Sequence, residues 1–279
     1  MNSAFYAMPV VIAALFALEH RFPLRSAKTR LADRLRVNVG LGALAVFTSL
    51  LIVKPVASAA WDMESRYPFG IMAMIPMPVI VEGVLTFLLL DLSFYYWHRA
   101  NHTVPILWRL HVVHHIDPDL DVTTAYRFHV LEIALSAGFR GLQVLLIGGP
   151  VWAAIAYEVA FQLNTAFQHS NLRLPIGVER GINLVMVTPR MHGIHHSKMK
   201  HETNANWSSV FSFWDRLHRT LELNTPQAQI DIGIAGYARP ADNRFWRALI
   251  MPFEPQRDYW SDSVKPTAGN APTRGGTQP

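Results

Sequence analysis

Residues 79–102 read VIVEGVLTFLLLDLSFYYWHRANH, an apolar run that leads directly into two histidines four positions apart. A helix that crosses a bilayer core needs about 20 mostly apolar residues, and this stretch has only Glu82 and Asp91 as charges before Trp97. His98 and His102 lie about one helical turn apart and share one helix face just beyond the apolar part. The stretch therefore predicts a membrane helix that carries a candidate metal-ligand pair at its end.

Other apolar runs predict the rest of the membrane domain, and together with this one they cover residues 3–18, 37–60, 71–97, 130–147 and 151–168. The first run lacks a basic segment before it and a small-residue cleavage site after it, so we interpret it as a retained helix rather than a signal peptide. Gly148-Gly149-Pro150 predicts a tight turn between the last two runs. The sequence thus predicts an all-α polytopic membrane protein with about four transmembrane helices, or five apolar segments including a hairpin over residues 130–168.

The composition excludes several classes of protein. Hydrophobic residues make up 51% of the 279 residues and charged residues only 16%, which is low for a soluble globular domain and excludes a disordered or collagen-like chain. The chain contains no cysteine, so disulfides, iron–sulfur clusters and a catalytic thiol are excluded. We expect no nucleic-acid partner for a chain this apolar.

Lysine and arginine predict the orientation in the membrane. Residues 20–36 contain six of them, whereas residues 61–70 contain only Arg66. Cytoplasmic segments carry the excess of these residues, so residues 20–36 and the histidine-rich segments are expected on the cytoplasmic face. We favour a bacterial inner membrane over the endoplasmic reticulum.

Histidine is the unusual residue, with 13 copies in three clustered patterns. The patterns are His98-x3-His102, His111-x2-His114-His115 and His192-x2-His195-His196. At this composition an H-x2-H-H pattern arises by chance roughly 0.03 times per chain, so two copies reject an accidental origin. Spacings of three and four place side chains on one helix face, and each triplet is therefore expected to aim its rings at a common point.

Eight histidines exceed the three or four ligands of a mononuclear zinc site and suit two ions of iron, copper or zinc. The zinc-protease signature H-E-x-x-H is absent from the sequence. A metal transporter would place its ligands near the middle of the membrane, whereas these histidines follow the helix ends. A zinc hydrolase would need a general base, for which Glu132 is the candidate near a histidine motif.

The set of motifs resembles that of the fatty acid hydroxylase/sterol desaturase superfamily, whose members are integral-membrane di-iron enzymes. The similarity extends to RFHVLE at residues 127–132, which resembles R-x-H-P-x-E with Val130 in place of proline, and to QHSN at 168–171. NANW at 204–207 and FWDRL at 213–217 resemble the N-Y-G and W-D-R-L elements. The superfamily then continues F-G-T, where this chain has His218-Arg219-Thr220. The resemblance covers residues 15–225.

This resemblance implies two iron ions and O2 as co-substrate, with zinc able to replace iron in the purified protein. It implies hydroxylation of an unactivated C–H bond in a lipid such as a sterol or fatty acyl chain, or desaturation on the same site, and we favour hydroxylation. It also implies ligands beyond the eight histidines. His129 and His169 lie 40 residues apart, the length of about two membrane helices, so both can reach one membrane face as ligands or as hydrogen-bond partners of ligands.

Further residues are assigned supporting roles. Asp91, on the same helix face as His98, and Glu132 are expected to act as hydrogen-bond partners behind the metal ligands. Aromatic side chains are available to line a lipid pocket under the metals, and they are Phe94, Tyr95, Trp97, Phe161 and Phe167. Because the chain has no cysteine and no credible dinucleotide fingerprint, we expect electrons from a separate partner, a ferredoxin or a b-type cytochrome with its reductase.

Three regions are expected along the chain. Residues 1–97 hold the first membrane helices with the basic segment 20–36, and residues 98–225 hold the histidine motifs together with the hairpin 130–168. Residues 226–279 form a C-terminal extension that is expected to be disordered after about residue 254.

Overall fold

Long helices build the first two thirds of the chain, and short ones build the rest. The computed structural model describes residues 2–261, with side chains from residue 8 onward, and this part contains no β-strand, which confirms the all-α class. The long elements are α1 (Asn2–Arg21), α2 (Leu31–Thr48), α3 (Lys54–Arg66), α4 (Val79–Thr103), α5 (Pro105–His115), α6 (Val130–Ile147) and α7 (Val151–His169). The short helices are α8 (Ile176–Asn183), α9 (Pro189–His195), α10 (Lys200–Thr203), α11 (Phe213–His218) and α12 (Phe245–Ile250). Single turns of 3-10 helix occur at η2 (Thr124–Tyr126), η3 (Gln227–Gln229), η4 (Ala235–Tyr237) and η5 (Met251–Phe253).

Three helical stretches of the described chain are long and apolar enough to cross a membrane. They are Leu31–Arg66, Val79–Thr103 and Val130–Ile147, and only about a quarter to a third of each apolar window is buried within the protein. Most of their side chains are thus half-buried or exposed, as expected for helices that contact lipid. The helices predicted for residues 3–18 and 151–168 form as α1 and α7, but they are not among these three stretches.

The first of these stretches is a continuous helix of 36 residues with an internal irregularity. A π-helical segment, η1 (Ser49–Val53), joins α2 to α3, and Pro55 lies in the first turn of α3. Proline lacks the N–H that an α-helix would bond to the preceding turn, and the π-helical segment lies in that preceding turn. The apolar run 37–60 therefore remains one membrane helix despite its proline.

The turn between α6 and α7 confirms the prediction for residues 148–150. Gly148 and Gly149 have φ angles of 70° and 93°, which glycine adopts at no steric cost. A Cβ on Gly149 would also approach the Thr86 side chain to 2.1 Å, so the turn packs closely against α4. The turn brings α7 back alongside α4 and returns the chain to the end where the histidines lie.

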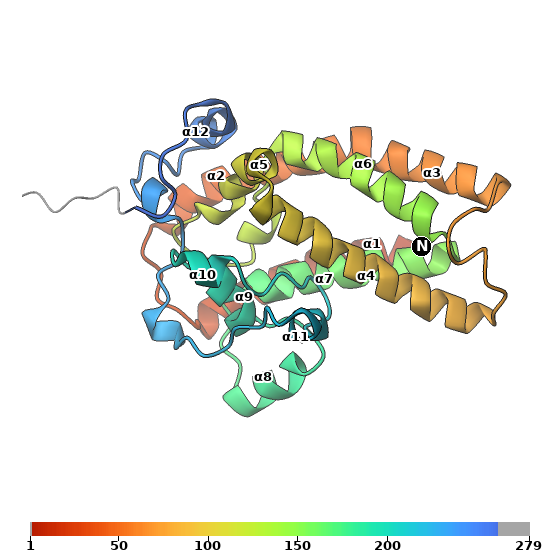
Figure 1. Cartoon of the computed structure of the whole chain (residues 1–279). Helices are drawn as coiled ribbons and strands as arrows, with labels where there is room; N and C mark the ends of the chain where they lie inside the picture. The colour runs from red at the N-terminus through yellow and green to blue at the C-terminus, as the bar shows by residue number, and fades with distance from the viewer. Residues whose placement is uncertain (1, 262–279) are drawn as a thin grey trace, which may run out of the picture.

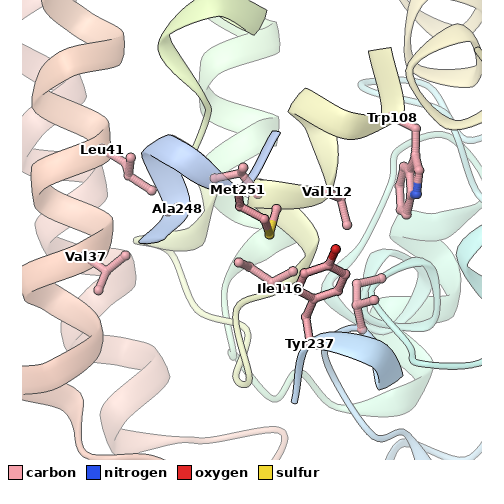
Figure 2. Close-up of a cluster of buried hydrophobic side chains, with 10 residues drawn as sticks. Val37, Leu41, Trp108, Val112, Ile116, Tyr237, Ala248 and Met251 are labelled. Carbon is pink, nitrogen blue, oxygen red and sulfur yellow. The ribbon is translucent and has the colours of Figure 1, made fainter. Parts of the chain in front are cut away.

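The two ends of the molecule differ in character (Figure 1). In Figure 1, α3, α4 and α6 extend toward one end, whereas the short elements α8–α12 gather at the other end, near the C-terminal ends of α4 and α7. Figure 2 shows the largest apolar cluster of this second end, in which Val37 and Leu41 of α2 face Val112 of α5 and Met251 of η5. The C-terminal segment thus packs between two of the N-terminal helices.

Residues 255–261 of the C-terminal extension are ordered against this cluster, in contrast to the expectation of disorder after about residue 254. Arg257 forms an ion pair with Asp242, with Nη2···Oδ1 at 2.6 Å. The backbone N–H of Gly236 donates to the carbonyl of Tyr259 at 2.9 Å. The rest of the segment expected to be disordered, 262–279, lies outside the described residues.

Candidate metal centre

Nine histidines converge from the ends of four helices. The last two turns of α4 carry His98 and His102, and Pro105 then starts α5, whose histidines face back toward them. The last residue of α7 is His169, and α9 supplies the distal motif. Convergence therefore depends on a proline-started reversal after α4 and on the hairpin that returns α7 to the same end.

The nine rings form two groups in which the candidate ligand nitrogens all lie within 4.8 Å of one another. The first histidine group comprises His98, His102, His111, His115 and His195. The second histidine group comprises His114, His169, His192 and His196. All four rings of the second group are buried, whereas the first includes two half-buried rings on α4.

Each of the two H-x2-H-H triplets contributes histidines to both groups. The expectation that each triplet aims its rings at one point is therefore wrong. His111 and His115 point into the first group, whereas His114 points into the second. In the distal motif, His192 and His196 join the second group and His195 joins the first. On a helix, residues i+3 and i+4 lie about 100° apart around the axis, so an H-x2-H-H motif can serve two neighbouring centres.

Hydrogen bonds made by the Nδ1 atoms fix the orientation of five rings. In each case Nδ1 donates to an oxygen that can only accept, so the proton is on Nδ1 and the lone pair is on Nε2. The Nδ1···O distances are His98 to Trp207 O 2.9 Å, His111 to Glu132 Oε1 2.7 Å, His114 to Arg127 O 3.2 Å, His169 to Thr165 O 2.7 Å and His195 to Ala205 O 2.8 Å. These rings present Nε2 to the interior of the two groups.

The second group contains contacts that two neutral imidazoles would not make by themselves. His169 Nε2 lies 3.0 Å from His114 Nε2 and 3.0 Å from His192 Nε2. His114 and His169 both carry their proton on Nδ1, so their Nε2 lone pairs face each other. Two nitrogens bound at about 2.1 Å to one ion lie about 3.0 Å apart at a right angle and about 3.4 Å apart at the tetrahedral angle. The donor set therefore fits a shared metal ion.

Unpartnered ring nitrogens in the first group also indicate a site for a metal ion. Nε2 of His111 and of His195 is buried without a hydrogen-bond partner, and neither ring nitrogen of His115 has one. Buried polar atoms are normally paired, so a set of orphaned imidazole nitrogens aimed at one point fits a second ion.

Burial keeps these rings in the neutral form that binds metals. Desolvation, with smaller contributions from neighbouring histidines, lowers the pKa of His114, His115, His192 and His196 well below the usual value. Burial lowers the pKa of His195 to about 3. The imidazoles are thus available as ligands at neutral pH.

Comparisons with known proteins agree with this chemistry. The family profile described as fatty acid hydroxylase matches residues 83–220, which contain all nine of these histidines. The chain belongs to the fatty acid hydroxylase superfamily. No solved structure matches it.

The curated relatives of this superfamily member act on lipids, by their names. Ornithine lipid hydroxylase OlsE of Rhizobium tropici is 28% identical over 63% of this chain and 51% of its own length. Human alkylglycerol monooxygenase is 32% identical over 49% of this chain and 29% of its own length. Human cholesterol 25-hydroxylase is 26% identical over 63% of this chain and 64% of its own length. The match thus spans less than two thirds of each relative.

His129, expected near the metals from the superfamily's motif, lies outside both groups. It caps the N-terminus of α6, where its Nδ1 accepts a hydrogen bond from Leu131 N at 3.1 Å. Its Nε2 donates to Leu249 O at 3.1 Å. Both nitrogens are therefore engaged, and the ring ties α6 to α12 instead of facing the other histidines.

Asp91 and Glu132 occupy different places relative to the histidines. Glu132 accepts the His111 Nδ1 hydrogen bond directly. Among the described residues, Asp91 forms no hydrogen bond with a histidine, and its carboxylate instead accepts bonds from Val210 N and Phe211 N at 3.2 and 3.0 Å. Asp91 thereby anchors to α4 the loop that precedes α11.

Asp215 is a supporting residue that the sequence reasoning did not select, although it lies within the noted W-D-R-L element. Its carboxylate accepts bonds from the backbone N–H groups of Trp207 and Ser208 at 3.0 and 2.9 Å. The carbonyl of Trp207 in turn accepts the His98 Nδ1 bond. Asp215 thus holds the peptide that orients His98.

Arg127, also part of a superfamily motif, connects the metal centre to α2. Its Nε donates to Val113 O at 2.8 Å and its Nη1 to Asn38 Oδ1 at 2.9 Å, while its carbonyl accepts from His114. Nearby, Arg34 of α2 pairs with Asp117, with Nε···Oδ1 at 2.8 Å. Burial alone would raise the pKa of Asp117, but the Arg34 and Arg127 guanidiniums outweigh burial and hold it at about 2.

Three of the five aromatic residues expected to line a lipid pocket pack together where α4, α6 and α7 meet. Phe94, Trp97 and Phe161 belong to one packed apolar cluster, in which the Phe94 and Phe161 ring centroids are 4.5 Å apart. Tyr95 instead stacks on His218 at 4.4 Å, and Phe167 is outside the cluster. A cavity of about 680 Å³ lies elsewhere, under the loop 23–31, and none of these rings lines it.

Proposed function

We propose that this chain is a membrane-bound di-iron oxygenase that uses O2 and external electrons to hydroxylate an unactivated C–H bond of a lipid. The observation that carries the proposal is the division of nine histidines into two adjacent groups, each with bare ring nitrogens facing one point. All-nitrogen ligation suits iron, and the superfamily relatives are named hydroxylases or monooxygenases.

In this proposal each histidine group holds one iron ion. The iron pair supplies the activation of O2, which no amino-acid side chain can perform. The chain's own residues hold and orient the centre: Glu132 fixes His111, and the peptide held by Asp215 fixes His98. The four rings of the second group are buried, which limits the access of bulk water to the ligands.

The net reaction balances as R–H + O2 + 2 electrons + 2 protons giving R–OH + H2O. Desaturation on the same site would remove a second hydrogen in place of returning oxygen to carbon. The names of the relatives favour hydroxylation. We infer a lipid substrate that approaches from the bilayer between α4, α6 and α7, whose aromatic rings form one apolar cluster that on α4 directly precedes His98.

We also infer that the histidine groups lie on the cytoplasmic side. The basic segment 20–36 is at the same end of the molecule, since Arg34 pairs with Asp117 and Lys28 pairs with Asp231. Positive segments stay in the cytoplasm, which supports this orientation. The electrons would come from a separate cytoplasmic protein of ferredoxin or b-type cytochrome kind.

Metal content of the purified full chain tests the proposal. We would measure iron, zinc and copper per polypeptide in the wild type, in His195→Ala, in His196→Ala and in the double variant. His201→Ala is the matched control, because His201 is exposed and belongs to neither group. We expect about two irons in the wild type and the control, and loss of iron from either group when its ligand is removed.

Lipid products provide the second readout. Lipids extracted from cells that express the wild type should contain a species with one added oxygen atom, and this species should be absent with the double variant. A species that has lost two hydrogens would indicate desaturation. Full iron content in the double variant, or zinc-loaded protein that iron cannot replace, would overturn the di-iron proposal.

A further inference from the structure

A stack of two tryptophans connects the first histidine group to the protein surface. The Trp108 and Trp260 ring centroids are 6.1 Å apart, with 15° between the ring planes. The Trp108 ring centroid also lies 4.9 Å from that of His102 and 5.5 Å from that of His115. Both of these histidines belong to the first group.

Trp108 is buried and Trp260 is partly exposed, as a connection from the histidines to the protein surface requires. Trp108 is only 7% exposed and lies at the edge of the apolar cluster on α5 (Figure 2). Trp260 is half-buried and is therefore the more exposed of the two residues. Among the residues described with side chains, Trp108 is the tryptophan whose ring contacts histidines of these groups.

The backbone holds Trp260 in place. Gly236 donates its N–H to Tyr259 O, and a Cβ on Gly236 would come within 2.0 Å of Asp258 O. Arg257 is fixed by Asp242 through two hydrogen bonds of 2.9 and 2.6 Å. These contacts fix the position of the C-terminal segment, and with it the Trp260 indole beside Trp108.

We propose that Trp260 and Trp108 form the route by which electrons pass from a docked protein donor to the metal ion held by the first histidine group. This inference rests on the proposed function. Electron transfer between proteins slows steeply with distance, and aromatic rings in near contact provide strong electronic coupling through a protein that is otherwise insulating. Each catalytic cycle takes two electrons in single steps, the donor is oxidised, the metal centre is reduced, and neither indole changes its net oxidation state.

The partner is a one-electron carrier, an iron–sulfur or b-type haem protein, that places its redox group beside Trp260. Core packing accounts for the burial of Trp108 and places Trp260 against the same cluster, but it does not require the two indoles to lie parallel. The inference therefore predicts that electron transfer depends on the aromatic ring of Trp260.

Anaerobic stopped-flow reduction tests this route without relying on turnover. The iron-loaded full chain in detergent is mixed with reduced [2Fe–2S] ferredoxin or, in a parallel series, with reduced cytochrome b5, and the loss of metal-centre absorption is followed at several donor concentrations. We compare the wild type with Trp260→Leu and Trp260→Phe. Trp246→Leu is the matched control, since Trp246 is 74% exposed on the same C-terminal segment and its ring contacts Phe245.

We expect Trp260→Leu to lower the rate at saturating donor by about tenfold or more, and Trp260→Phe to stay within about threefold of the wild type. Trp246→Leu should leave the rate unchanged. Dithionite, a small reductant that needs no docking site, should reduce all four proteins at similar rates, and all four should contain equal iron.

Several results would overturn the route. A wild-type rate in Trp260→Leu would do so, as would an equal loss in Trp260→Phe, an equal loss in Trp246→Leu, or no reduction of the wild type by either donor protein. A change only in the donor concentration at half saturation would make Trp260 a docking residue and also overturn the relay. Iron that dithionite cannot reduce, or no bound iron, would instead overturn the proposed function, and this inference with it.

Discussion

His114 Nε2 lies 3.0 Å from His169 Nε2, although each ring donates its Nδ1 proton to a backbone carbonyl. The two lone pairs face each other in a buried site, which is unfavourable unless a cation lies between them. The helices that carry the two rings, α5 and α7, both pack against α4. The arrangement of the two rings therefore fits a cation bound between them.

His169 and His129 make a matched pair for testing this geometry. His169→Ala should remove the metal of the second group, so that iron falls from about two to about one per chain or lower. His129→Ala should keep both irons and lower the free energy of unfolding by about 0.5–2 kcal/mol, because His129 caps α6. Metal analysis and thermal unfolding of the two variants would check this, and iron loss in His129→Ala would contradict the assignment.

Removal of the metals should destabilise the folded protein, because the bare lone pairs are then left in contact. Chelator treatment of the wild type should lower its thermal midpoint, and added Fe²⁺ should restore it. An ion at 100 times its dissociation constant stabilises the fold by about 2.7 kcal/mol. The double variant of His195 and His196 serves as the control and should show no response to chelator, whereas a full response in that variant would place the metal elsewhere.

Glu132 is expected to tune the centre through His111. Its Oε1 accepts the His111 Nδ1 bond at 2.7 Å in a buried site. Glu132→Ala should weaken metal binding about 10–100-fold, whereas Glu132→Gln keeps an acceptor oxygen and should lose less. Competition with a chelator measures both affinities, and equal losses in the two variants would mean that the charge, rather than the hydrogen bond, is what matters.

The sequence predicted much of this centre because the histidines are encoded locally. Helical spacing within 98–102, 111–115 and 192–196 puts pairs of rings on one face, and this periodicity can be recognised without a structure. The division of His114 and His195 from their neighbours could not be predicted in the same way. It depends on where α7 and α9 lie relative to α5, and that is determined by long-range packing.

His129 and Asp215 are two further residues whose roles depend on contacts that the sequence pattern does not show. His129 has the spacing and the motif of a ligand, but α12, more than 100 residues later in the chain, provides the carbonyl that engages its Nε2. Asp215 acts through the peptide of Trp207, and a hydrogen bond to backbone leaves no side-chain pattern in the sequence. The structure of residues 255–261 was not predicted for a related reason, since it depends on the Arg257–Asp242 ion pair, the Gly236–Tyr259 backbone bond and the contact of Trp260 with distant Trp108.

The Asp117–Arg34 ion pair should make stability depend on acid pH. The pKa of Asp117 is about 2 in the folded protein, below its usual 3.8, so folding favours the carboxylate. The contribution is complete above about pH 4 and is lost as the pH falls through about 2, because protonation then favours the unfolded chain. Asp117→Asn should cost about 2–3 kcal/mol at pH 7, and the difference from the wild type should shrink between pH 4 and pH 2.

Thermal unfolding of both proteins across this pH range would check the prediction. Asp33→Asn is the control, since Asp33 forms an exposed pair with Arg36 and should change stability by less than about 0.5 kcal/mol. A constant difference between the wild type and Asp117→Asn from pH 7 to pH 2 would show that the ionised carboxylate is not the source of the stability.

Arg219 is strained in a way that glycine should relieve. It has φ 59° and ψ 36° directly after α11, and its side chain is exposed. The superfamily's F-G-T element has glycine at this position, where no Cβ opposes the left-handed conformation. Arg219→Gly should therefore raise the free energy of unfolding by up to about 1 kcal/mol, and Arg219→Val should lower it by about 1–2 kcal/mol. Unfolding of both variants would check this, and a less stable glycine variant would mean that the arginine side chain stabilises the turn by more than its backbone costs.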